Sequence, residues 1–182
     1  MKAILTFSFL FFYSIICAQI QGVESTWSDS FKEWNVYALD QDGEEIEGHL
    51  KMRWQMNEDW SEWDYRIGEV FGAIKVKWKD NPNQWEVRGG GEIINVQTVY
   101  RNDMTKWRLS SEGRVLILEL NKYDVAFDWR VDNPKYGFYE VYTDWEGDPR
   151  SWSVVDELDV EISIHMKMAI IFFSFFSSTP RF

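Results

Sequence analysis

Few side chains of the sequence could act as a catalytic nucleophile or base. The chain has one cysteine, Cys17, and two histidines, His49 and His165. Neither histidine lies in a motif with the spacing of a nucleophile and its base. We therefore expect no nucleophilic catalysis and no cofactor. We expect His49 on the polar face of a strand and His165 near the mouth of the fold.

One stretch combines carboxylates with aromatic rings, as carbohydrate-active sites do. Residues 57–66 read NEDWSEWDYR, with Asp59, Glu62 and Asp64 beside aromatic residues. Hydrolysis of a glycosidic bond needs two carboxyl groups at a defined separation and with different pKa values, which a sequence does not show. We interpret the stretch as a solvent-exposed loop with aromatic anchors. A carbohydrate-active protein remains an alternative.

Five basic residues occur in, or directly after, two similar segments. Residues 48–54 (GHLKMRW) and 72–78 (GAIKVKW) share glycine, lysine, a second basic residue and tryptophan at the same spacing, which indicates two equivalent strands. Their outward faces could hold an anionic head group, or could be solvated and paired with Glu45, Glu47 and Glu86. The candidate ligand-binding residues are Lys51, Arg53, Lys75, Lys77 and Lys79.

Composition and charge narrow the class of protein. The 182 residues suffice for one domain with a core, and an aromatic content of 18% excludes a disordered chain. The net charge of −11 makes nucleic acid an improbable partner, because its phosphates are repelled.

DQDGE, at residues 40–44, lacks the later ligands of a calcium loop and is interpreted as a hairpin turn.

The first 18 residues have the pattern of a signal peptide. Lys2 is followed by an apolar stretch over residues 4–16, and the small Ala18 is a cleavage position. We therefore expect an exported protein that is periplasmic, secreted or at the cell surface. Cleavage there removes Cys17, although acylation of this cysteine is an alternative. We expect residues 19–30 to form an N-terminal lead-in.

From residue 31 onward, apolar and polar residues alternate in short segments. Turns rich in Gly, Pro, Asn and Asp separate these segments. This pattern predicts antiparallel strands with one buried face, in a closed β-barrel of roughly ten to twelve strands. The four clearest apolar series are Ile46, Gly48, Leu50, Met52 and Trp54; Ile74, Val76 and Trp78; Val125, Phe127, Trp129 and Val131; and Tyr139, Val141, Thr143 and Trp145.

The alternation stops near the C-terminus. LDVEISIHMKMAIIFFSFF, at residues 158–176, ends in an apolar run that is too short for a membrane anchor. A segment that is apolar on every side must be buried on every side. We predict a helix over about residues 160–176, with Asp159 as its N-cap and with Glu161 and His165 as i,i+4 neighbours. Its place is the interior of the barrel, which side chains alone do not fill.

The same segment resembles a known family. DELDVEISIHMKMAIIFFSFF, together with YALDQDGEEIEG (37–48) and RSWSVVDELD (150–159), is similar to the tubby-like superfamily of tubby C-terminal domains, phospholipid scramblases and LURP-one-related proteins. The resemblance implies a barrel of roughly twelve strands closed around a C-terminal helix, and phosphoinositide binding through basic residues. From the scramblases it implies calcium candidates at Asp156 and Asp159, although residues 149–152 depart from their acidic stretch.

Together these observations predict one barrel domain over residues 31–182. The expected function is a non-enzymatic binding or structural protein of the tubby-like type, whose partner is an anionic membrane surface, a lipid head group or another protein. A lipocalin-like carrier of a small apolar ligand is a second alternative, and it requires the C-terminal segment to lie outside the barrel.

Overall fold

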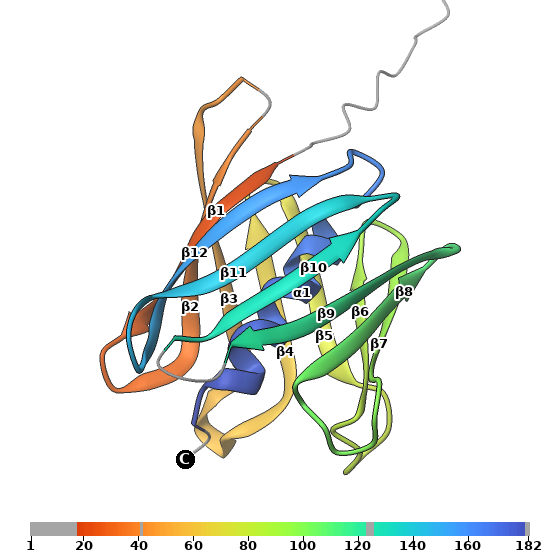
Figure 1. Ribbon diagram of the computed structural model, residues 1–182. Coiled ribbons are helices and arrows are strands. Elements are labelled where there is room, and N and C mark those ends of the chain that lie inside the picture. The colour runs from red at the N-terminus through yellow and green to blue at the C-terminus, as the bar shows by residue number, and fades with distance from the viewer. Residues whose placement is uncertain (1–17, 41, 123–125, 181–182) are drawn as a thin grey trace, which may run out of the picture.

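The computed structural model describes residues 18–40, 42–122 and 126–180. They form a closed antiparallel barrel around one helix (Figure 1). Each strand pairs with its neighbours in the sequence, and the first strand closes the barrel against the last. The elements are β1 (Gln19–Trp27), β2 (Ser30–Leu39), β3 (Glu45–Trp54), the 3-10 helix η1 (Gln55–Asn57), β4 (Asp59–Ile67), β5 (Val70–Val76), β6 (Gln84–Gly89), β7 (Glu92–Thr98), β8 (Lys106–Ser111), β9 (Arg114–Lys122), β10 (Asp128–Asn133), β11 (Gly137–Trp145), β12 (Asp148–Leu158) and α1 (Ile164–Ser178).

The barrel predicted from the alternating pattern is confirmed, with two corrections to its boundaries. The expected lead-in at residues 19–30 is wrong, because β1 lies there and pairs with both β2 and β12. The expected loop at residues 57–66 is also wrong, because most of it is strand β4. The predicted signal peptide and Cys17 lie outside the described residues, apart from the buried Ala18 that directly precedes β1.

Helix α1 occupies the interior of the barrel (Figure 1). Every residue from Ile164 to Phe176 is buried. The lipocalin-like alternative required this segment to lie outside the barrel, so the structure does not provide the empty interior that such a carrier needs. Packing of α1 against the inward faces of the strands creates the core.

The helix begins later than predicted. A turn separates it from β12, in which the Ile162 amide donates to the Asp159 carbonyl and the Glu161 amide donates to the Asp159 carboxylate. The N-cap is therefore Ser163, whose hydroxyl accepts from the Met166 amide at 3.1 Å. The expected cap by Asp159 and the i,i+4 pair of Glu161 with His165 are both wrong.

The alternating pattern fails at the end of three hairpins. Trp54 and Trp145 belong to predicted inward series, yet each lies beyond a register shift and is exposed. Trp27 at the end of β1 follows an equivalent shift. Such irregularities redirect side chains at barrel rims. Trp78 is also exposed, because β5 ends at Val76 and a turn follows.

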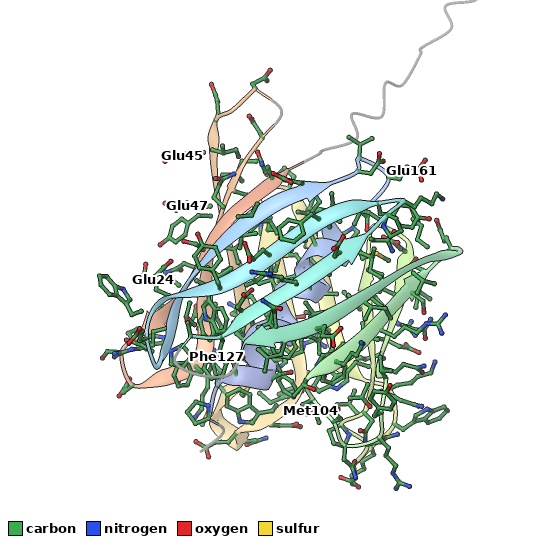
Figure 2. The ribbon with its side chains drawn as sticks, viewed as in Figure 1. Glu24, Glu45, Glu47, Met104, Phe127 and Glu161 are labelled. Carbon is green, nitrogen blue, oxygen red and sulfur yellow. The ribbon has the colours of Figure 1, made fainter. Side chains whose placement is uncertain are left out.

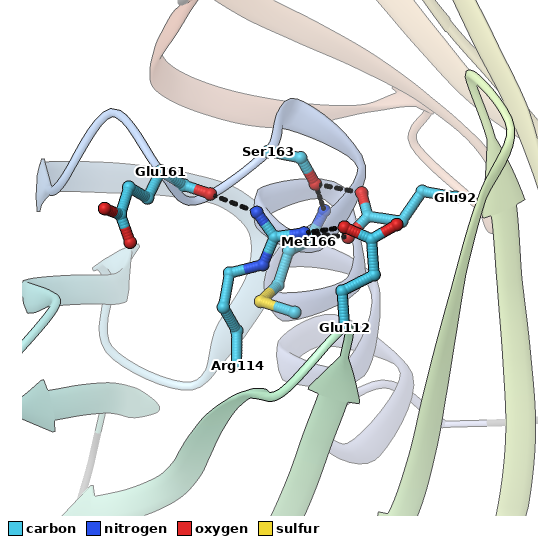
Figure 3. A network of polar contacts seen from close by, with 6 residues as sticks. All are labelled: Glu92, Glu112, Arg114, Glu161, Ser163 and Met166. Carbon is cyan, nitrogen blue, oxygen red and sulfur yellow. Dashed lines mark hydrogen bonds and ion pairs between the residues drawn. The ribbon is translucent and has the colours of Figure 1, made fainter.

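Polar contacts hold the start of α1 against the barrel (Figure 3). Ser163 donates to Glu92 at the start of β7, and Arg114 at the start of β9 forms an ion pair with the same glutamate. Arg114 also donates to the Glu161 carbonyl at 2.7 Å and pairs with Glu112. This network fixes the loop before α1 to two strands.

The next turn of α1 carries two buried polar contacts. Lys167 forms an ion pair with Asp156 of β12 at 2.8 Å, and both side chains are almost fully buried. The Nδ1 atom of His165 lies 2.6 Å from the Tyr65 hydroxyl of β4. Gly89 makes this approach possible, because a Cβ atom there would overlap the His165 ring. Burial lowers the pKa of His165 and raises that of Tyr65.

We expect Lys167→Met to lower the free energy of unfolding by about 3–5 kcal/mol, because it leaves Asp156 charged and unpaired inside the barrel. The double variant Lys167→Met/Asp156→Leu removes both charges and should recover most of that loss. Urea unfolding measures both. The exposed pair of Arg66 with Glu69 supplies the control, and Glu69→Gln should change the value by less than about 0.5 kcal/mol. Equal losses in the single and double variants would contradict the idea that Lys167 compensates the buried charge of Asp156.

We also expect stability to fall when the solution becomes acidic. The pKa of His165 is lowered in the folded protein, so the unfolded chain, in which histidine titrates near about pH 6.5, binds the proton more tightly. The free energy of unfolding has its full value above that pH and decreases below it. Urea unfolding between pH 7.5 and 5.5 should show this decrease, and His165→Gln should reduce it. His49 also has a lowered pKa but is only partly buried, so His49→Gln should reduce the decrease less than His165→Gln does.

Candidate functional site

One end of the barrel contains two layers of aromatic residues. Odd-numbered strands end there and even-numbered strands begin there; we call it the rim end. The inner ring consists of six buried tryptophans, one on each even-numbered strand: Trp34, Trp63, Trp85, Trp107, Trp129 and Trp152. The outer rim consists of exposed aromatic residues within two residues of the end of an odd-numbered strand: Trp27, Trp54, Trp78, Tyr100 and Trp145.

Five of the six members of the inner ring contact the second half of α1. Trp34 stacks on Phe175 with ring centroids 4.4 Å apart, and Trp107 lies 4.5 Å from Phe173. The indole N–H of Trp129 donates to the hydroxyl of Ser178 at 2.9 Å, and that of Trp107 donates to Ser177 at 3.0 Å. The inner ring thus holds the end of the helix by both packing and hydrogen bonds.

Five members of the inner ring share one local structure. The indole N–H donates to the carbonyl three residues earlier, at 2.8 to 3.1 Å. The first residue of each copy is serine, aspartate or asparagine. Its side-chain oxygen accepts a hydrogen bond from the backbone amide of the third residue, at 2.9 to 3.3 Å. The five copies are Ser30-Phe31-Lys32-Glu33-Trp34, Asp59-Trp60-Ser61-Glu62-Trp63, Asn81-Pro82-Asn83-Gln84-Trp85, Asp103-Met104-Thr105-Lys106-Trp107 and Asp148-Pro149-Arg150-Ser151-Trp152.

Sequence reasoning missed this repeat, although a signal was present. Serine, aspartate or asparagine, then an apolar residue, two variable residues and tryptophan recur five times. Trp63, Trp85, Trp107 and Trp129 are each 22 residues apart. The predicted two-copy repeat at residues 48–54 and 72–78 has a spacing of 24 residues. It lies on β3 and β5, which are separated by β4.

Three of the five apolar residues of the repeat pack against the core at the rim end. Phe31, Trp60 and Met104 are partly buried against the core, as is Phe127 before β10. Figure 2 shows Met104 and Phe127 at the end of the barrel opposite Glu161, which precedes α1. These side chains close the rim end of the core, so a ligand there would bind on its outer surface.

Two clefts open at the rim end on either side of the loop between β5 and β6. The first has a volume of about 550 Å³ and the second about 630 Å³, and they share Asp80, Asn81 and Pro82. The first is lined by Asp59, Trp60, Ser61, Val76, Lys79, Asp80, Asn81, Pro82, Trp85 and Phe176. The second is lined by Asp80, Asn81, Pro82, Asn83, Gln84, Gln97, Thr98, Arg101 and Asn102.

Hydrogen bonds among amides make the wall of the second cleft rigid. The Asn83 side chain donates to both Asn81 and Asn102, and its own oxygen accepts from the Thr98 hydroxyl at 3.1 Å. It also accepts the backbone amide of Asn102 at 2.6 Å. The cleft therefore presents polar groups in fixed positions, while the first cleft adds the aromatic surface of Trp60.

Carboxylates of the repeat serve the turns in which they lie. The Ser61 hydroxyl and amide lower the pKa of Asp59, and the Thr105 hydroxyl and amide lower that of Asp103. The guanidinium of Arg150 lowers the pKa of Asp148. A general acid for glycoside hydrolysis needs a raised pKa. These three groups are therefore suited to accept hydrogen bonds, not to donate a proton.

The carboxylates expected to act together at residues 57–66 are separated in the structure. Asp59 lines the first cleft, whereas Glu62 and Asp64 lie on the outer wall and form ion pairs with Arg53. Trp63 and Tyr65 of the same strand point inward and are buried. Alternation along β4 thus prevents these residues from forming one site.

The five predicted basic residues lie on β3 and β5 or just beyond β5, with acidic residues between them. Arg53 is paired as described, Lys75 is opposite Glu62 in the strand register, and Lys77 pairs with Glu86 at 3.3 Å. Lys51 faces Asp64 in the register, and Lys79 lines the first cleft. Of the expected acidic partners only Glu86 lies here, since Glu45 and Glu47 lie further along the wall (Figure 2).

The calcium candidates do not come together. Asp156 points into the barrel toward Lys167, and Asp159 holds the turn before α1. Among the described residues, no group of three or more His, Cys, Asp or Glu side chains is placed to bind a metal ion.

Comparison with known proteins finds no family model, no curated protein and no solved structure that matches the chain. Within the described part of the chain, no helix has the length and apolar character to span a membrane.

We expect Trp34→Phe to lower the free energy of unfolding by about 1–3 kcal/mol, because it removes the hydrogen bond to the Phe31 carbonyl and reduces packing on Phe175. The control is Trp27→Phe on the same hairpin, which is half exposed and should change the value by less than about 0.5 kcal/mol. Urea unfolding monitored by circular dichroism compares them. Equal effects would show that the inner ring has no special structural role.

Proposed function

We propose that the protein is an exported, non-enzymatic binding protein that holds a saccharide in the first cleft of the rim end. The observation that carries this proposal is the lining of that cleft, where the ring of Trp60 lies among Lys79, Asp80 and Asn81. A sugar has an apolar ring face and a hydroxyl edge. An aromatic surface bordered by polar groups suits both.

Binding without catalysis fits the electrostatics of the site. The pKa of Asp59 is lowered, so at neutral pH this carboxylate accepts hydrogen bonds from hydroxyl groups. The second cleft continues past Asn81 with amide side chains. Together the clefts could hold more than one sugar unit, with the polar residues of the second cleft as the extension.

The other expected ligands have less support. A lipid head group on the basic face would compete with Glu62, Asp64 and Glu86, which already pair with the basic residues there. Membership of the tubby-like superfamily remains a proposal, supported by the passage from β12 through an acidic turn into a central apolar helix. Export is proposed on the N-terminal pattern, and β1 begins directly after the expected cleavage position.

The proposal predicts that a cleft variant loses saccharide binding while it remains folded. A panel of hexasaccharides of glucose, galactose, mannose and N-acetylglucosamine is screened, and the best ligand is titrated by calorimetry. Asp80→Asn and Lys79→Ala should each weaken that binding by roughly tenfold, the effect of losing one or two hydrogen bonds. Asparagine is chosen because Asp80 has a φ of 63°.

The matched control is Glu69→Gln, which changes a charge in the turn between β4 and β5 at the opposite end of the barrel. It should bind like the parent protein. If no saccharide binds, or if the cleft variants bind as well as the control, the proposal is wrong.

A further inference from the structure

Among the described residues, the exposed tryptophans lie at one end of the molecule only. The exposed fractions are 54% for Trp27, 49% for Trp54, 60% for Trp78, 64% for Tyr100 and 69% for Trp145. At the opposite end, the exposed large apolar residues of the described chain include Phe71, Ile93 and Val160 but no tryptophan. The exposure of tryptophan is therefore specific to the rim end.

The chemistry of these side chains matches a bilayer interface. Trp and Tyr have an apolar body and a polar tip, and they concentrate at the level of lipid head groups. The strands hold them apart around the barrel, so they do not form the continuous apolar centre of a protein interface. Three of them follow equivalent register shifts in the hairpins β1–β2, β3–β4 and β11–β12. The fold thus exposes the aromatic rings by one recurring device.

Charged residues near the outer rim form ion pairs, which suits a partner surface that has no net charge. Lys32 pairs with Glu58 at 2.7 Å, and Arg150 pairs with Asp148 at 2.6 Å. The wall toward the other end carries Glu45 and Glu47 (Figure 2), and the whole chain has a net charge of −11. An anionic membrane would repel that wall, whereas a zwitterionic or uncharged surface would not.

We infer that the outer rim docks end-on at the interface of a neutral lipid bilayer, and that the saccharide in the first cleft is the head group of a lipid in that bilayer. The second part rests on the proposed function. Docking through the outer rim brings the first cleft, which lies at the same end, to the level of the head groups. The barrel stays outside the hydrocarbon, and its acidic wall stays in water.

The test is sedimentation of the full chain with phosphatidylcholine vesicles, with and without monogalactosyl diacylglycerol. The parent protein should sediment with both, more tightly when the galactolipid is present, and 0.5 M NaCl should not release it because the contact does not depend on charge. Two double variants, Trp78→Ser/Trp145→Ser and Trp27→Ser/Tyr100→Ser, should each bind phosphatidylcholine roughly tenfold less tightly. Thermal unfolding checks that both are folded.

The control is Phe71→Ser, which removes an exposed aromatic ring at the opposite end and should leave vesicle binding unchanged. Docking is overturned if the parent protein does not sediment, if binding requires anionic lipid, or if both folded double variants bind like the control.

Lys79→Ala separates the two proposals, because it should abolish the gain from galactolipid but keep the binding to phosphatidylcholine. No gain in the parent protein overturns the head-group assignment. Vesicle binding without binding of any soluble hexasaccharide overturns the proposed function and leaves docking in place.

Discussion

The structure depends on one constraint, which is that the interior of a twelve-stranded barrel must be filled. Inward side chains of so many strands do not meet across the axis, and an apolar helix supplies the missing volume. The two ends of α1 are fixed by different means. Buried polar contacts through Ser163, His165 and Lys167 hold its first turns, and the inner ring packs on its last turns. Because α1 occupies the interior, the proposed binding surfaces lie outside the barrel.

Much of this architecture follows from local sequence patterns. The alternation predicts the strands, and its loss after Met168 predicts a buried helix, since the residues there are apolar on every side. The predicted helix starts too early because Val160 and Ile162 continue the apolar pattern through the turn between β12 and α1. The hydrogen bond from the Glu161 amide to the Asp159 carboxylate forms that turn. Strand β1 was missed because QIQGVESTW contains few large apolar residues, and pairing on both sides stabilises it.

The site was harder to predict than the fold. Whether a tryptophan joins the inner ring or the outer rim depends on register shifts between two strands, which a single-strand pattern does not contain. Trp54 and Trp63 are nine residues apart, whereas Trp78 and Trp85 are seven apart, and this variable loop length concealed the repeat. The clefts are formed by loops of different hairpins, so the pairing of β4 with β5 and of β6 with β7 brings their residues together.

The pairing of β1 with β12 has a consequence for biosynthesis. Ten strands separate β1 from β12 in the chain, yet each is the other's partner, and the helix that fills the barrel is made later still. Long-range contacts of this kind make folding slow, because distant segments must meet before either is stabilised. While the ribosome still covers residues near 170, neither the seam nor the core can form. Hairpins of neighbouring strands can pair before then, but their inward aromatic residues have no helix to pack against until α1 is made.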